Sequence, residues 1–160
     1  MKVNMSKDTI IMCIGCLLAT ILLILFVPRN KIREAHVIFL FVQVITWLVG
    51  LIVVEYRLIE YPDRFFEYST KTSFAFEYFI YPSICIIFNL YYPEKKNIFR
   101  QFMHNAYYCT GITITEVLCE RYTNIIKYIH WSWYITWITL FITFYASRIY
   151  YVWFFRLKNN

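Results

Sequence analysis

The chain has 160 residues, of which 60% are hydrophobic, 22% are aromatic and only 16% are charged. Soluble domains carry about 25% charged and roughly 45–50% apolar residues, so this composition excludes a soluble enzyme, a nucleic-acid-binding domain and a disordered tail. The net charge of +6 is interpreted as charge that faces an anionic membrane surface. The composition therefore predicts an integral membrane protein.

Five apolar stretches of about 20 residues are long enough to cross a bilayer. Backbone groups in hydrocarbon must be satisfied within each segment, and the apolar runs are continuous rather than alternating, which favours α-helices over a barrel. Pro82 is expected to bend the third stretch, because proline lacks an N–H group. The expected fold class is all-α, a single membrane domain over residues 1–160 with five transmembrane helices at about residues 9–27, 36–54, 72–91, 98–118 and 128–155.

The connection between the second and third stretches, residues 55–71, is expected to form a short interfacial helix on the outer surface. Leu58, Tyr61, Phe65 and Tyr68 recur at helical spacing, and charged residues fill the gaps between them. Pro62 must then lie in the first turn of this helix or break it.

Lysine and arginine residues beside the predicted spans indicate the orientation. Nine of them lie on the side of the first and third connections and the C-terminus, against seven on the other side. The positive-inside rule then places the N-terminus outside and the C-terminus in the cytoplasm. Arg148, within the fifth stretch, is expected to extend toward inner headgroups, with pairing to Glu94 as the rarer alternative.

Acidic side chains in the predicted spans are the candidate functional residues, because an ionisable group at the centre of a span costs about 2.5–3.5 kcal/mol on insertion scales. Glu116 and Glu120 are four residues apart and share a helix face. Salt bridging to the nearby cationic residues Arg57, Arg121 and Lys127 is favoured over a cation or proton site. The candidate polar site comprises the following residues: Glu55, Glu77, Glu116, Glu120, Arg57 and Arg121.

No motif in the sequence indicates a catalytic, cofactor-binding or metal site, and three glycines exclude a glycine-rich phosphate loop. Cys13 and Cys16 form a C-x-x-C pair inside an uncharged stretch, where helix packing with Gly15 and Ala19 is favoured over metal binding. The histidines each lie near the end of a span, which favours an interfacial position: His36, His104 and His130.

Three segments carry a family resemblance: ITWLVGLIVVEYRLIEYPDRFF, TSFAFEYFIYPSICIIFNLYYPEKK and EVLCERYTNIIKYIHWSWYITW. Over about residues 47–137 the chain resembles an uncharacterised family of small multi-pass membrane proteins of spore-forming Gram-positive bacteria. The most specific parts are Glu77-Tyr78, Tyr81-Pro82, Glu116, Glu120 and Tyr122-Thr123-Asn124. The resemblance implies a helical protein of the bacterial plasma membrane, and because the family has no assigned activity it implies no mechanism.

The function expected from the sequence is a non-enzymatic structural or interaction component of the bacterial plasma membrane. Its partners would be the lipid bilayer and a second copy or another membrane protein, without nucleic acid or cofactor. The alternative is a subunit that transports a small solute, a cation or a proton through an outer-leaflet glutamate cluster. Secondary transporters usually show repeated halves, which this chain lacks, so a complete transporter is disfavoured while a pore-forming oligomer is not.

Overall fold

The computed structural model describes residues 6–156 and shows a helical bundle, which confirms the predicted helical fold class. A two-stranded antiparallel sheet is the one addition among the described residues. The elements in chain order are α1 (Lys7–Phe26), η1 (Arg29–Lys31), α2 (Ile32–Glu55), β1 (Ile59–Glu60), η2 (Phe74–Ile80), α3 (Tyr81–Leu90), α4 (Ile98–Tyr122), β2 (Lys127–Tyr128) and α5 (Trp133–Arg156).

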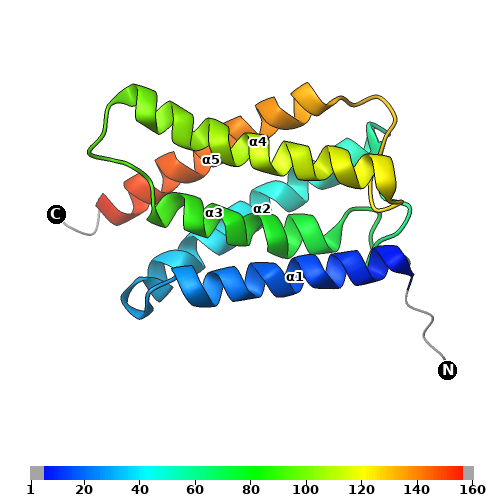
Figure 1. Cartoon of the computed structure of the whole chain (residues 1–160), viewed down its shortest axis with the longest axis horizontal. Helices are drawn as coiled ribbons and strands as arrows, with labels where there is room; N and C mark the ends of the chain where they lie inside the picture. The colour runs from blue at the N-terminus through cyan, green and yellow to red at the C-terminus, as the bar shows by residue number, and fades with distance from the viewer. Residues whose placement is uncertain (1–5, 157–160) are drawn as a thin grey trace.

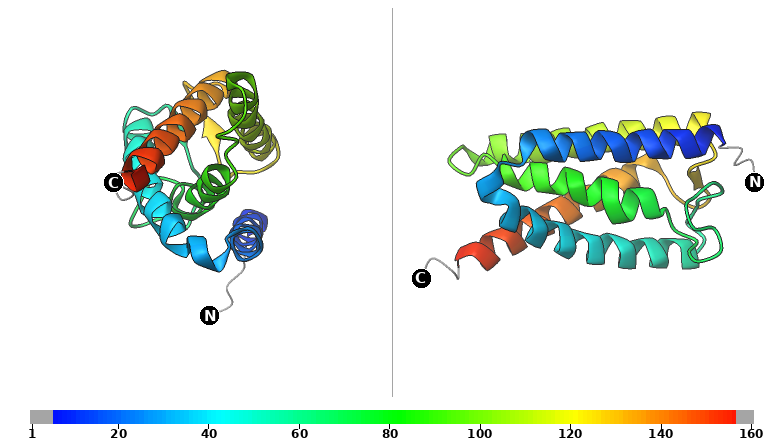
Figure 2. Two further views of the ribbon diagram at one scale, coloured as in Figure 1. Left: turned by 90° about the vertical axis from the view of Figure 1, so that its left-hand side faces the viewer. Right: turned by 90° about the horizontal axis from the view of Figure 1, so that it is seen from below.

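The helices run along the long axis of the molecule, with α1, α3 and α4 in front of α2 and α5 (Figure 1). Seen end-on, α3 lies near the middle of the bundle (Figure 2), and seven of its side chains are buried. The start of α1 and the end of α5 lie at opposite ends (Figure 1). We call the end with residues 56–73 and 123–132 the strand end, and the end with residues 27–31 and 91–97 the C-terminal end.

Three helical segments are long and apolar enough to cross a membrane: Lys7–Phe26, Arg29–Glu55 and Trp133–Phe155. The apolar segment Phe74–Leu90 is shorter. The fourth helix, α4, has 25 residues but carries charged residues near both ends. The length and composition of these three helices thus indicate a membrane protein. The segments η2–α3 and α4 run alongside them.

The centre of the bundle is an aromatic cluster around Phe144 of α5, whose side chain is fully buried. Its ring centroid lies 4.6 Å from that of Phe88, 5.3 Å from that of Tyr81 and 5.9 Å from that of Tyr108. The Tyr81 hydroxyl lies 2.5 Å from the Thr143 hydroxyl, so its polar end is satisfied inside the bundle. These contacts hold α3, α4 and α5 together.

Helix α1 packs on η2 and α3 through a narrow face. Asp8, Met12 and Ala19 are buried on this face, and a Cβ at Gly15 would lie 3.1 Å from Ile80. Cys13 is exposed, so the thiol of that residue does not take part in the packing that the sequence suggested for it. The rest of α1 presents apolar side chains outward, as a lipid-facing helix does.

The expected interfacial helix at residues 55–71 is wrong, because this segment forms β1 and a series of turns. Tyr61 is buried while Tyr68 is fully exposed, so the apolar residues do not share one face. Strand β1 pairs with β2, and Ile59 lies opposite Tyr128. This long-range pairing holds the backbone of the segment in an extended conformation in place of a helix. The Arg64 guanidinium donates hydrogen bonds to the carbonyls of Tyr61, Glu67 and Thr70 and holds the remaining turns.

Arg148 does not extend to the headgroups as expected. Its side chain is buried and its guanidinium pairs with Glu94, the arrangement that the sequence ranked second. It also lies 4.4 Å from the Tyr92 ring centroid and donates to the Asn89 carbonyl over 3.3 Å. Partners from the end of α3 and from the α3–α4 connection therefore hold the guanidinium inside the bundle, where its charge is compensated.

Asp8 and Asp63 take part in the hydrogen bonds that join α1 to the loops at the strand end. The Asp8 carboxylate accepts a hydrogen bond from the Asn124 backbone N–H over 3.2 Å, and Asp63 N–H donates to the Asn124 carbonyl over 3.0 Å. Burial, and then the hydrogen bond and the charge of Asp8, raise the pKa of Asp63 above its ordinary value of 3.8. The Ser6 hydroxyl partly offsets this rise, and Glu67 adds to it.

We expect Asp63→Asn to stabilise the protein at neutral pH. The raised pKa means that Asp63 binds its proton more tightly in the folded state than in the unfolded state. Its contribution to stability is therefore complete below the ordinary carboxyl pKa, and it is lost as pH rises through the raised pKa. Asparagine carries no charge at any pH and avoids this loss. The melting temperature of the variant in detergent should exceed that of the parent at pH 7, and the gap should close toward pH 4. Glu60→Gln, an exposed position on β1, is the control. A gap that does not change with pH would refute the explanation.

Candidate functional site

A cavity of about 100 Å³ lies within the bundle toward the strand end. This volume is enough for several water molecules. Side chains of α2, η2, α4, α5 and the two connections at the strand end line it, and no lysine or arginine of the described chain does so. Its polar lining residues are Thr46, Tyr61, Glu77, Tyr81, Glu116, Trp131, Thr136, Thr139 and Thr143.

The Glu77 carboxyl group is buried against the backbone of α2. A Cβ atom built on Gly50 would lie 2.1 Å from Glu77 Oε2, so only a glycine at this position leaves room for the carboxyl group. Tyr61 and Thr72 are its hydrogen-bonding neighbours. Oε2 is buried and has no hydrogen-bond partner among the described residues. Glu77 thus brings an unsatisfied oxygen into the interior, which is costly unless a cation or proton neutralises it.

The irregular backbone around Glu77 explains how this side chain is positioned. Residues Phe74–Ile80 form a π-helix that changes to α-helix at Tyr81, next to Pro82. Proline supplies no N–H to the carbonyl four residues earlier. Instead, Gln43 Nε2 donates to the Tyr78 carbonyl over 3.0 Å, and the Thr46 hydroxyl donates to the Glu77 carbonyl over 2.7 Å. Side chains of α2 thereby satisfy the backbone groups that the break in regular helix frees, as membrane interiors require.

Glu116 of α4 enters the cavity from the opposite side with a different set of partners. Its Oε1 accepts hydrogen bonds from the Tyr128 hydroxyl over 2.6 Å and the Thr136 hydroxyl over 2.8 Å. Trp131 Nε1 donates in turn to Thr136 Oγ1 over 2.8 Å. These donors fix the position of the Glu116 carboxylate without a cationic side chain.

Tyr61, from the connection after β1, lies close to both carboxylates. Its pKa is raised well above the usual range by burial, and further by the charges of Glu77 and Glu116. Burial and Glu116 also raise the pKa of Tyr128. Both phenols therefore remain protonated at physiological pH and are available as hydrogen-bond donors.

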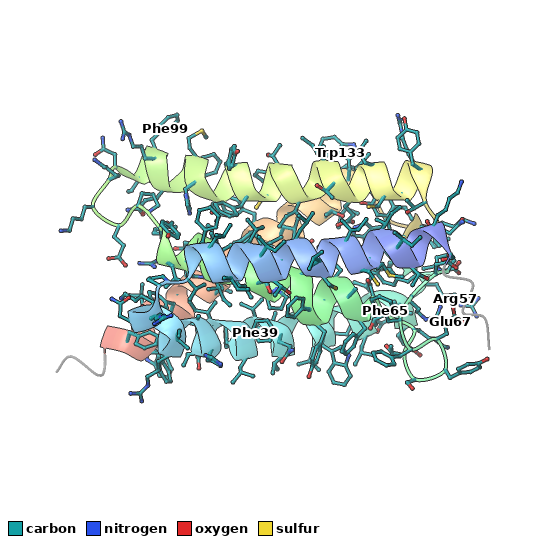
Figure 3. All side chains as sticks on the ribbon, turned by 60° about the horizontal axis from the view of Figure 1, so that its bottom comes forward. Phe39, Arg57, Phe65, Glu67, Phe99 and Trp133 are labelled. Atoms are coloured by element: carbon teal, nitrogen blue, oxygen red, sulfur yellow. The ribbon has the colours of Figure 1, made fainter. Side chains whose placement is uncertain are left out.

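The structure brings together only two of the six predicted site residues. Glu77 and Glu116 line one cavity, whereas Glu55, Arg57 and Arg121 are exposed, and Glu120 is half-buried one turn beyond Glu116. The salt bridges between described side chains join Lys31 to Glu34 and Arg148 to Glu94. The expected pairing of Glu116 with Arg57 or Arg121 is therefore wrong, because Arg57 is exposed on the turn after α2 and Arg121 is exposed in the last turn of α4. Figure 3 shows Arg57 and Glu67 at the strand end of the molecule.

Sequence reasoning missed the hydroxyl and glycine residues of this site. Thr136, Thr139 and Thr143 recur at intervals of three and four residues along α5, which places their hydroxyls on one helix face. That spacing was visible in the sequence. The positions of Tyr61 and Gly50 were not, since they depend on the β1–β2 pairing and on the close approach of η2 to α2.

The three histidines do not contribute to this cavity. His36 and His104 lie toward the C-terminal end, where they contact the carbonyls of Ile32 and Phe88 over 2.8 and 3.2 Å. His130 is exposed at the strand end.

Comparisons of the chain with known protein families, with curated proteins and with solved structures find no match.

Proposed function

We propose that this chain is a non-enzymatic, five-pass protein of the bacterial plasma membrane that binds a small monovalent cation or a proton between Glu77 and Glu116. The occupant supplies the positive charge that the cavity lining lacks. The protein would serve as a cation-binding subunit in a transport process, with the strand end facing outward.

The five-pass topology extends the three apolar spans to η2–α3 and α4. All five helical segments lie along one axis, and the chain starts and finishes at opposite ends of it (Figure 1). An α-helix rises 1.5 Å per residue, so the 25 residues of α4 extend about 37 Å, beyond the roughly 30 Å of hydrocarbon. Its charged termini would then reach the headgroups. The bacterial plasma membrane is proposed from the family resemblance described above.

The observation that carries the cation-binding proposal is Glu77 Oε2, a buried carboxylate oxygen without a partner in the described structure. A carboxylate in an apolar interior is stable only when it is protonated or paired with a cation. Carboxylate and hydroxyl oxygens surround the space beside it. Ion sites of transporters likewise occur where a membrane helix departs from regular geometry, as η2 does here.

A structural or interaction role is the second candidate, and an apolar groove of about 380 Å³ between α1 and α4 favours it. Small residues on both helices line this groove: Gly15, Gly111, Thr115 and Cys119. Such residues permit close approach of another transmembrane helix.

Glu77→Gln should greatly reduce the response of the purified protein to cations or pH while keeping its fold. A cation at a hundred times its Kd stabilises the folded state by about 2.7 kcal/mol, or roughly 5–10 °C in melting temperature for a chain of this size. The measurement is the melting temperature in detergent between pH 5 and 8, in sodium, potassium or choline chloride at equal ionic strength. We expect a cation- or pH-dependent shift in the parent, and a much smaller one in Glu77→Gln and Glu116→Gln.

Glu60→Gln is the matched control, since it removes an exposed carboxylate at the same end of the molecule. A shift with sodium or potassium beyond that with choline identifies a metal cation, and a shift with pH alone identifies a proton. If all four proteins respond equally, the cavity binds neither.

A further inference from the structure

A second cavity, of about 710 Å³, lies at the C-terminal end between the α3–α4 connection, the start of α4 and the last turns of α5. One wall is polar and comes from the connection and α4. The other comes from α5 and includes apolar side chains that face outward. The residues that the argument uses are Glu94, Lys95, Gln101, Ile149, Val152 and Trp153.

The polar wall is held in place by hydrogen bonds around Gln101. Its Nε2 donates to the carbonyls of Glu94 and Lys96 over 3.3 and 3.1 Å, and its Oε1 accepts from the Tyr92 hydroxyl over 3.3 Å. This side chain therefore fixes the path of the connection and the position of Lys95 at the edge of the cavity. The site is an ordered feature of the fold.

The charge of the lining is positive. Glu94 compensates Arg148 in a salt bridge, which leaves Lys95 as the remaining charged residue of the lining. Lys96 and Arg100 are exposed on the same connection and at the start of α4, but they do not line the cavity. A lysine close to an anionic lipid headgroup contributes about 1 kcal/mol to its binding.

The apolar wall exposes side chains that lipid acyl chains could contact. Ile149 and Trp153 are exposed on α5, one turn apart, and Val152 is half-buried between them. Tryptophan prefers the level of the headgroups, where its ring contacts both chains and polar groups. The cavity thus joins a positive rim to an apolar ridge at the interfacial end of a membrane-spanning helix.

We propose that this cavity binds an anionic phospholipid, with the lipid phosphate beside Lys95 and Gln101 and an acyl chain along Ile149, Val152 and Trp153. A free phosphate would use the lysine but leave the α5 ridge uncovered. A zwitterionic lipid would cover the ridge but would bring a positive headgroup to Lys95. The proposal is independent of the cation site near the strand end.

The test measures binding of short-chain phosphatidylglycerol to the full chain in detergent, by native mass spectrometry and by thermal shift. Phosphatidylcholine of the same chain length and inorganic phosphate are the comparison ligands. We expect phosphatidylglycerol to bind more tightly than either. Lys95→Gln should weaken that binding about fivefold, the factor corresponding to about 1 kcal/mol. Trp153→Ala should weaken the binding of both lipids.

Lys96→Gln is the matched control, because it removes the same charge from the next residue, which does not line the cavity. Both lysines are exposed, so neither substitution disturbs packing. Equal losses for Lys95→Gln and Lys96→Gln would show a diffuse surface attraction and overturn the site. Equal binding of phosphatidylcholine and phosphatidylglycerol, or stabilisation by phosphate as large as that by the lipid, would also overturn it.

Discussion

Replacing Gly50 with alanine should displace the Glu77 carboxyl group from its position against α2 and destabilise the protein by about 1–3 kcal/mol, as overpacking of an interior does. The new Cβ would lie 2.1–2.4 Å from the three carboxyl atoms of Glu77, so either that side chain or α2 must move. Thermal stability in detergent measures the cost. The cation or pH response of the parent should be lost with it, because the carboxyl group no longer faces the cavity.

A double-mutant cycle separates this clash from a general effect on α2. Combining Gly50→Ala with Glu77→Ala removes the carboxyl group that the new methyl group would strike. The double variant should therefore be more stable than the sum of the single effects predicts, by about 1–3 kcal/mol. Gly111→Ala is the control, since a Cβ there meets no atom within 4 Å and should stabilise α4 by roughly 0.5–1 kcal/mol. Additive effects at Gly50 and Glu77 would contradict the described packing.

Phe144→Ala should be among the most destabilising substitutions in the chain, at about 3–5 kcal/mol. The side chain is fully buried and touches aromatic rings from α3 and α4, so its removal leaves a cavity that these rings cannot fill. Unfolding of the variant by a denaturing detergent, followed by circular dichroism, measures the loss.

Phe154→Ala provides the comparison, because the same residue type lies on the same helix but is 37% exposed. In a membrane its ring faces lipid, and its loss should cost much less than that of Phe144. Equal losses for the two variants would mean that α5 does not pack through Phe144 as described.

The sequence was sufficient to predict the helices, because an apolar run of about 20 residues has few alternatives in a bilayer. It also predicted a bend at Pro82, and the structure has a change from π-helix to α-helix at the residue before this proline. The segment after α2 was misinterpreted because its helical spacing is a local pattern. The structure is decided there by pairing of Ile59 with Tyr128, 69 residues later in the chain.

The candidate site was also predictable only in part. Burial of Glu77 and Glu116 could be expected from their positions inside apolar stretches. Their partners could not, because the arginines expected to pair with them do not reach the cavity: Arg57 is exposed on the turn after α2, and Arg121 is exposed in the last turn of α4. The residues that reach Glu116 are Tyr128 and Thr136, neutral donors that a search for charges overlooks.

The wide turn of η2 makes the position of Glu77 depend on residue count as well as on residue identity. A π-helical bond closes over one more residue than an α-helical bond does, so the segment Phe74–Ile80 holds an extra residue relative to regular helix. Deleting one residue between Glu77 and Pro82 would permit a continuous α-helix and change the direction in which Glu77 leaves the helix axis. Glu77 would then point away from Gly50, although no residue of the cavity had been substituted. We therefore expect a change in the length of this short stretch to disturb the site, and homologues that use the same site should keep the length of the segment.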